Sequence, residues 1–394
     1  MVRAIEAGGG RGCGIGRSAL TSGSALLLAL PNPAQAHVRW LTDAAPAGIA
    51  PESMATLLAS PAYLALLLLT LAGLAWVRRI DARLAGGGSP FMRLLVDCDA
   101  RMTPVAAPVL RIGLAVFFAA SAVHFRDVPF TLTPELMSPA DWAVPLKLLI
   151  ALGLLFPSGV VAACAGMLVL YLHSAQLQAA GHLLDYHLLF AVCVFLSVAH
   201  FSPRHGAATG LLLLRILVAS NFLWVGIERW LYPEWTSDVL EEQLPMLLMG
   251  LAPDSWTMAA GFVEVAFAFL LLFGGASSQV AAAVMLAAMA AAMPLVAPAD
   301  VIAHLPVLFS LFVLAVTRNR MPRGGKEHAS WQPADLLRVL LLGMMGLSGL
   351  YYMAHEFTEA LRVQLAGIWL ELVLVGVGGS ALVGWVARAR CAQR

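Results

Sequence analysis

The chain has 394 residues, of which 60% are hydrophobic and only 12% are charged, and its mean hydropathy is +0.82. A soluble domain carries about 25% charged residues, so this composition excludes a soluble globular protein and predicts a surface that faces a lipid bilayer. The formal net charge of +1 gives no reason to expect a nucleic-acid partner. None of the five cysteines falls in a segment that we place outside the cell, so no disulfide framework is predicted.

The first 36 residues predict a secretory signal peptide. A short apolar core at 19–30 follows a basic region, and a small-x-small cleavage site ends at Ala36. The basic region holds Arg3, Arg11 and Arg17. Cleavage after Ala36 would leave His37 at the mature N-terminus, where its α-amino nitrogen and imidazole form a chelate suited to copper. An uncleaved anchor is the alternative. Residues 37–60 then form a short periplasmic segment.

Eleven apolar runs long enough to span a membrane follow the signal. They lie at 61–77, 105–124, 142–156, 159–176, 186–201, 210–227, 256–273, 279–296, 301–316, 334–354 and 365–386. Helices satisfy their own backbone hydrogen bonds in lipid, whereas strands of a membrane barrel would alternate polar and apolar residues. The predicted fold class is therefore all-α, a polytopic bundle of about 11 transmembrane helices.

Basic residues predict the orientation of this bundle. An exported N-terminus puts most of them at cytoplasmic helix ends: Arg78, Arg79, Arg83, Arg93, Arg101, Arg204, Arg318, Arg320, Arg323, Lys326, Arg388, Arg390 and Arg394. The predicted outer loops hold only Arg39, Arg126, Arg229 and Arg362. This asymmetry follows the positive-inside rule. It predicts a multi-pass protein of a bacterial-type inner membrane with its mature N-terminus in the periplasm.

The spans also contain an internal repeat. Arg111, Arg215 and Arg338 each stand at the start of a span, and ionisable positions match in register: His124 with Glu228, Lys147 with Glu264, and His187 with His304. The second copy differs mainly by 13 extra residues in its first outer loop. We therefore divide the chain into a first helix with a cytoplasmic loop (61–104), two four-helix repeats (105–205 and 209–320) and a partial third repeat (334–390). Chance similarity among Leu- and Ala-rich segments is the alternative.

One copy resembles a known family. A four-helix membrane unit that opens with a basic residue and has a Gly-x-x-Glu helix ending in Phe-Gly resembles the DoxX/DoxD family. The stretch 214–275 carries this resemblance through Arg215, Gly226, Pro233, Gly261, Glu264 and Gly274. The first copy is less similar, with Lys147 where the family has Glu. The family includes the membrane subunit of a thiosulfate:quinone oxidoreductase, so the resemblance implies an association with redox chemistry or quinone.

Ionisable residues inside the spans are the first candidates for chemistry. Each costs about 2.5–3.5 kcal/mol on membrane insertion and usually faces a partner in the bundle interior. A Lys147–Glu264 or Lys147–Glu371 pair would be a structural explanation, and a proton relay or substrate-polarising group is the functional one. The candidates for such a role are Lys147, Glu228, Glu264, Asp300, His304 and Glu371.

Histidines gathered at the predicted outer surface are the second candidates. The six-residue segment 182–187 begins with His182 and ends with His187. Asp185 lies between them, where its carboxylate would fix the tautomer of an imidazole by accepting its second N–H. Because no cysteine thiolate is predicted on the outer side of the membrane, a site built from imidazoles favours Cu(II) or Zn(II). A haem held between His124 and His187 is an alternative. The predicted metal ligands are His37, His124, His173, His182, Asp185 and His187. Helix capping and headgroup contacts are the structural alternative.

Together these patterns predict a DoxX-like inner-membrane protein with a periplasm-facing, histidine-rich site. We expect a redox-linked role through copper, haem or quinone, with a respiratory or periplasmic redox partner in addition to the lipid bilayer. The sequence leaves open whether the chain is a subunit of a membrane oxidoreductase. Two alternatives are a copper uptake or transport protein, since parallel repeats suit alternating access, and a non-catalytic membrane subunit of a respiratory complex.

Overall fold

The structure is a computed structural model of the chain. The chain divides into two compact units, Met1–Ala34 and Gln35–Arg394, and everything described below belongs to the second. The described residues are 52–86, 89–127, 132, 140–177, 187–201, 206–242 and 245–319. Over these residues the structure is helical and has no strand, which confirms the all-α prediction for this part of the chain.

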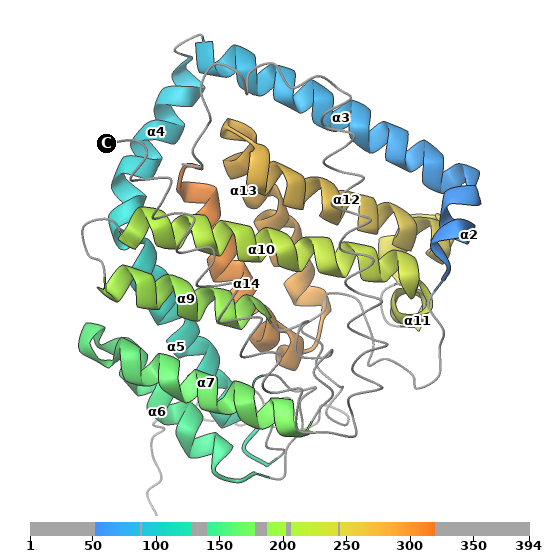
Figure 1. Ribbon diagram of the computed structural model, residues 1–394. Helices are drawn as coiled ribbons and strands as arrows, with labels where there is room; N and C mark the ends of the chain where they lie inside the picture. Colours follow the sequence, from blue (N-terminus) through green and yellow to red (C-terminus); the bar gives the residue numbers. More distant parts are fainter. Residues whose placement is uncertain are drawn as a thin grey trace, which may run out of the picture. The chain divides into compact units, whose positions relative to one another are not determined.

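Nine helices coincide with the first nine predicted spans (Figure 1). They are α3 (Pro61–Gly86), α5 (Ala106–His124), α6 (Ala143–Leu155), α7 (Val160–Leu177), α9 (His187–Phe201), α10 (Gly206–Leu231), α12 (Pro253–Phe273), α13 (Ala276–Ala292) and α14 (Pro298–Val316). Seven spans in the described residues are long and apolar enough to cross a membrane, and α6 and α9 are shorter apolar helices. The runs predicted at 334–354 and 365–386 lie outside the described residues, so the total of eleven stays a prediction.

Three further helices lie outside the predicted membrane spans because they lack a long apolar run. They are α2 (Met54–Ala59), α4 (Pro90–Met102) and α11 (Glu234–Glu242). The segment 61–104 is therefore not one helix followed by a loop. Ser89 caps α4 by accepting a hydrogen bond from the Met92 amide, and Pro90 stands at the first helical position. These local signals start a helix without any help from hydropathy.

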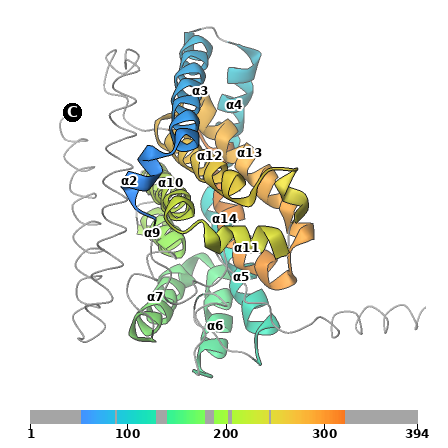
Figure 2. The same ribbon diagram turned by 90° about the vertical axis from the view of Figure 1, so that its right-hand side faces the viewer.

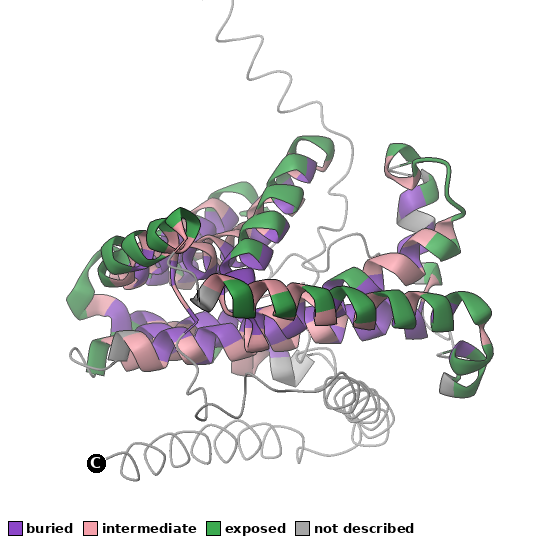
Figure 3. Cartoon of the chain, turned by 90° about the horizontal axis from the view of Figure 1, so that it is seen from above, coloured by how far each residue is buried: buried purple, intermediate pink, exposed green. Residues whose placement is uncertain are grey.

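The outer faces of the helices are apolar, as a lipid-facing surface requires. Leu69 of α3 is 68% exposed and Leu149 of α6 is 63% exposed, whereas water-soluble proteins rarely show contiguous apolar patches of this kind. On α5 the side chains of Leu110, Leu114 and Phe117 are buried at helical spacing. Figure 3 shows this division, with exposed residues on the outside of each helix and buried ones facing the neighbouring helices.

Two sets of four membrane helices pack in the same order along the chain. In one set α5 packs on α6, α6 on α7 and α7 on α9, and in the other α10 packs on α12, α12 on α13 and α13 on α14. Between the sets, α10 packs against α9 and α14 against α5 (Figures 1 and 2). The first helix of each set thus lies against the last helix of the other, and their buried side chains form one continuous apolar core.

A polar layer ties several helix ends together. Asp81 of α3 accepts hydrogen bonds from the Gly275 and Ser277 amides at 2.7 and 2.9 Å and so caps the start of α13. The Asn319 side chain donates to carbonyl oxygens at the end of α12, among them that of Gly274 at 3.0 Å. Arg215 of α10 donates to the Thr317 carbonyl oxygen at 3.0 Å. The ends of α3, α12 and α14 and the start of α13 therefore meet at one side of the bundle.

Candidate functional site

Two glycines bring α10 and α12 into close contact. A Cβ atom added to Gly226 would lie 2.9 Å from the Gly261 carbonyl oxygen, and one added to Gly261 would lie 2.7 Å from that of Gly226. No side chain larger than hydrogen fits in this crossing. Membrane helices use small residues in this way, because close backbone approach supplies van der Waals contact where lipid removes the hydrophobic driving force.

The crossing places an ion pair in the interior of the bundle. Arg229 and Glu264 each stand three residues after one of these glycines, on the same helix face. The Arg229 Nε donates to Glu264 Oε2 at 2.9 Å, and the two side chains are 1% and 6% exposed. Arg229 Nη1 also donates to Thr236 Oγ1 of α11 at 2.9 Å. The guanidinium is therefore held from two helices.

Aromatic rings pack beside the same crossing, where the Trp230 indole lies against Gly261. Trp230, Tyr63 of α3 and Phe262 of α12 pack together, with ring centroids 4.6 to 5.4 Å apart. The Trp230 indole N–H donates to the Met258 carbonyl oxygen at 3.1 Å, which satisfies its polar atom. The three rings belong to one buried apolar cluster formed by α3, α10 and α12.

The electrostatics of this cluster are those of desolvated charges. Glu228 is buried beside Arg229, at 2% exposure, so two carboxyl groups and one guanidinium lie within a short stretch of the same two helices. A buried ion pair contributes little net stability, since its attraction is offset by desolvation, but leaving one partner alone costs about 3–5 kcal/mol.

Comparison with known proteins identifies the part of the chain that holds this cluster. Residues 210–304 match the model of the DoxX family. This segment, which we call the DoxX domain, is similar to that family. It comprises most of α10, all of α11, α12 and α13, and the start of α14 through His304. The resemblance that the sequence indicated at 214–275 is thereby confirmed. A search of curated proteins and a search of solved structures each gave no match.

The DoxX domain corrects one sequence prediction. Arg229 was placed in an outer loop and Lys147 was considered as the partner of Glu264, whereas α10 continues through Leu231 and Arg229 makes the ion pair. Lys147 lies on α6, outside the domain, and is buried at 1% exposure. It is an interior residue, as predicted, but on a helix of the other packing set.

Two further candidates lie at the end of the DoxX domain. His304 is buried on α14, and its Nδ1 donates to the Asp300 backbone carbonyl oxygen at 2.6 Å. The two residues are therefore linked through the backbone of Asp300 and not through its carboxylate. Pro306 follows inside the helix. Because proline donates no hydrogen bond, it interrupts the helix ladder beside this histidine.

The described histidines of the first copy lie near the ends of their helices. His124 is exposed and packs edge-on against Phe125, with centroids 4.7 Å apart, and His173 packs against Trp142 at 4.8 Å. His187 is the first residue of α9. In the described part of the chain, no three His, Cys, Asp or Glu side chains come close enough to hold a metal ion. The predicted positions His37, His182, Asp185 and Glu371 lie outside the described residues.

Sequence reasoning missed Arg229 and Thr236 as members of the site. A signal for the first was present, because Gly226-x-x-Arg229 and Gly261-x-x-Glu264 share the same spacing and so predict facing charges if the glycines meet. Nothing in the sequence marks Thr236, which reaches Arg229 only because α11 folds back over the end of α10.

Proposed function

We propose that this chain is a redox-linked inner-membrane protein whose DoxX domain binds a quinone head group beside Arg229 and Glu264. The observation that carries the proposal is the buried ion pair at the glycine crossing. An intramembrane charge pair is expensive to insert, and such residues mark substrate sites and proton pathways. The resemblance to a family that includes a quinone oxidoreductase subunit supports a quinone as the ligand.

The chemistry of the pair suits this ligand. Reduction of a quinone to a quinol takes up two electrons and two protons, and both protons must reach oxygens that lie within the membrane. In the proposal the Arg229 guanidinium donates a hydrogen bond to one quinone oxygen. The Glu264 carboxyl gives a proton to that same oxygen on reduction and takes it back on oxidation. Aromatic rings of the kind supplied by Tyr63 and Trp230 give a flat ring an apolar surface to pack on.

The electron partner in this proposal is a metal at the periplasmic surface. His124, His173 and His187, joined by His182 and Asp185, are the proposed ligands in the first copy, with copper as the preferred ion and haem as the alternative. His37 would belong to a separate N-terminal copper chelate. The uneven distribution of histidines along the sequence supports this arrangement.

Helix packing supports the proposed duplication. The first helix of one set, α5, packs against the last helix of the other set, α14. In the same way α10 packs against α9. Two copies of one unit related by a pseudo-twofold axis along the membrane normal would pack in this way. In such a pair Lys147 and Glu264 occupy matching positions on α6 and α12.

The proposed threading, with the mature N-terminus in the periplasm, has support of its own. The predicted cytoplasmic ends of α3, α12 and α14 meet in the polar layer, where Arg78 donates to the Phe273 carbonyl oxygen at 2.9 Å and Asp99 accepts from the Arg318 amide at 2.8 Å. Alternating threading requires these ends to share one side. The arginines among them then favour the cytoplasm as that side.

One observation favours the transport alternative. Pro306 lies inside α14, two residues after the buried His304, and interrupted membrane helices are common where transporters bind their substrates. In a copper uptake protein this break would be the place where the ion passes.

The content of bound groups in the purified protein tests the proposal. The protein is extracted in mild detergent, and quinone is measured by solvent extraction and chromatography, haem by absorbance and metals by mass spectrometry. We expect quinone to co-purify with the chain, together with copper or haem. A preparation that contains no quinone and takes up none on addition would overturn the proposal, while copper without quinone would favour the transport alternative.

A further inference from the structure

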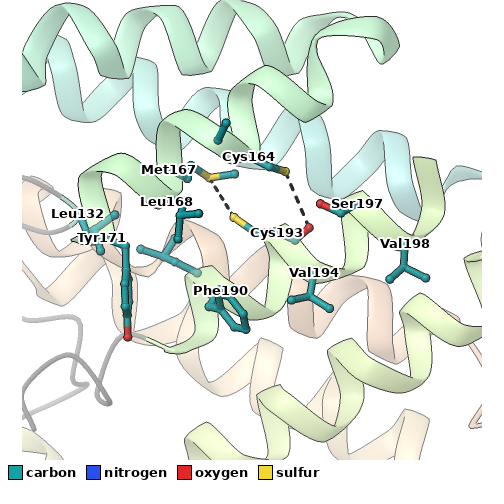
Figure 4. A pocket seen from close by; sticks show the side chains of 12 residues that line it. Leu132, Cys164, Met167, Leu168, Tyr171, Phe190, Cys193, Val194, Ser197 and Val198 are labelled. Atoms are coloured by element: carbon teal, nitrogen blue, oxygen red, sulfur yellow. Dashed lines mark hydrogen bonds between the residues drawn. The ribbon is translucent and has the colours of Figure 1, made fainter. Parts of the chain in front are cut away.

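A second cluster of chemically active side chains lies outside the DoxX domain. α7 and α9 pack together and line a cavity of about 330 Å3. Its walls are apolar apart from the hydroxyl groups of Tyr171 and Ser197 and two cysteine thiols (Figure 4). A space of this size between two helices, with a few polar groups in its wall, has the character of a small-ligand site.

Three sulfur atoms gather on one wall of this cavity. The Cys193 thiol of α9 donates to the Met167 sulfur of α7 at 3.5 Å, and the Cys164 thiol contacts the Cys193 carbonyl oxygen at 3.8 Å, as the dashed lines in Figure 4 show. Neither cysteine forms a disulfide. Cys164 and Met167 share one face of α7 through their spacing of three residues.

From this geometry we infer that Cys164, Cys193 and Met167 form a binding site for Cu(I). Thiolate and thioether sulfurs are soft ligands that select Cu(I) over harder ions. Ligand sulfurs about 2.3 Å from a shared ion in trigonal or tetrahedral geometry stand roughly 3.7–4.0 Å apart. The 3.5 Å between the Cys193 and Met167 sulfurs is close to this spacing, so a small side-chain adjustment opens room for the ion.

The chemistry of binding follows from the ligands. A thiol ligates as the thiolate, so each ligating cysteine releases its proton to solvent as the ion enters. No electron is transferred, and copper stays Cu(I) throughout. The surrounding apolar wall keeps out water and hard anions that would compete for the ion. This site does not rest on the proposed quinone site, since it uses other helices and other ligands.

Buried cysteines can also serve simply as small apolar residues in a helix interface. A Cu(I) titration of the purified protein distinguishes that role from metal binding. Purified protein is titrated anaerobically with Cu(I) against a chromophoric chelator. We expect the wild type to take a single Cu(I) ion with high affinity at this site. The double variant C164S/C193S should lose it, because losing a ligand weakens binding by at least the roughly 10–100-fold seen for outer-shell partners.

Two further variants make the result specific. Cys98 of α4 is another free cysteine in the described residues, and C98S should bind Cu(I) as the wild type does. M167L keeps the volume of the side chain and removes only the thioether, so it should bind more weakly while the copper-free protein melts at the wild-type temperature. X-ray absorption of the loaded wild type should show a sulfur-dominated first shell that C164S/C193S lacks.

Absence of a sulfur-bound Cu(I) in the wild type would overturn this inference, as would unchanged binding by C164S/C193S. The quinone content of C164S/C193S should remain that of the wild type. A chain without quinone that still binds Cu(I) through sulfur would refute the proposed function and leave this inference standing, so the two proposals fail separately.

Discussion

Gly226 and Gly261 face each other where α10 crosses α12, with room for a hydrogen atom but not for a methyl group between the backbones. Arg229 and Glu264 stand three positions after these glycines. Because the two backbones lie so close, the two charged side chains form an ion pair. The packing of two small residues and the position of a buried charge pair are therefore one feature of the DoxX domain.

The close crossing predicts a specific sensitivity to small substitutions. Gly261→Ala should lower the free energy of unfolding by about 1–3 kcal/mol, because the added methyl group overpacks the crossing. Thermal melting of the purified protein in detergent measures this. Gly73→Ala on α3 is the matched control, since nothing lies within 4 Å of a Cβ atom there, and it should be neutral or slightly stabilising. Equal effects of the two substitutions would contradict the packing argument.

The buried ion pair predicts a strong coupling between its two members. Glu264→Gln or Arg229→Met alone should destabilise by about 3–5 kcal/mol, because each leaves a desolvated charge unpaired. The double variant R229M/E264Q should recover most of that loss, and a double-mutant cycle on melting data measures the coupling. Additive effects of the two single changes would refute it.

The exposed pair of Arg126 and Asp127 provides the control for that cycle. Their side chains are 73% and 84% exposed, so solvent screens their attraction. Arg126→Ala should therefore leave the melting temperature unchanged within error.

The polar layer at the α12–α13 turn predicts a capping effect. Asp81→Ala should destabilise by about 0.5–2 kcal/mol, because the amides at the start of α13 lose their acceptor. Asp97 lies exposed on α4, so Asp97→Ala should have no measurable effect in the same melting experiment. If the Asp81→Ala and Asp97→Ala variants have the same melting temperature, the capping role of Asp81 is refuted.

The proposed orientation predicts which residues a membrane-impermeant thiol reagent reaches. With the native cysteines removed, Asp127→Cys should be labelled in intact spheroplasts, since 127 lies at the predicted periplasmic end of α5. Asp97→Cys should be labelled only after the membrane is permeabilised. The opposite pattern would invert the topology and move the predicted histidine site to the cytoplasmic side.

Hydropathy was enough to predict the positions of the membrane helices. α13 and α14 are long apolar runs that need no tertiary contact to be recognised, because lipid admits only helices there. The end of α10 was predicted too early because Glu228 and Arg229 read as polar loop residues. Their burial depends on α12 and α11, which supply Glu264 and Thr236, and no local pattern contains that information.

The sequence alone also gave no sign that Cys164 and Cys193 lie close together. They are 29 residues apart, and their proximity arises from the packing of α7 against α9. Short helices such as α4 were missed for a different reason, since capping by Ser89 outweighs the absence of an apolar run. The sequence therefore predicts the spans well, whereas side-chain neighbours between helices come from the packed bundle.

The central claim is that the Glu264 carboxyl takes part in binding quinone. Affinity for a water-soluble quinone, measured by fluorescence titration of the Trp-rich DoxX domain in the full-length protein, tests it most directly. Glu264→Gln should weaken binding roughly tenfold or more, because a hydrogen bond to a charged group is worth about 1.5–3 kcal/mol. Glu241→Gln, an exposed acid on α11, should bind like the wild type. Equal affinity in all three proteins, or no quinone binding at all, would contradict the account.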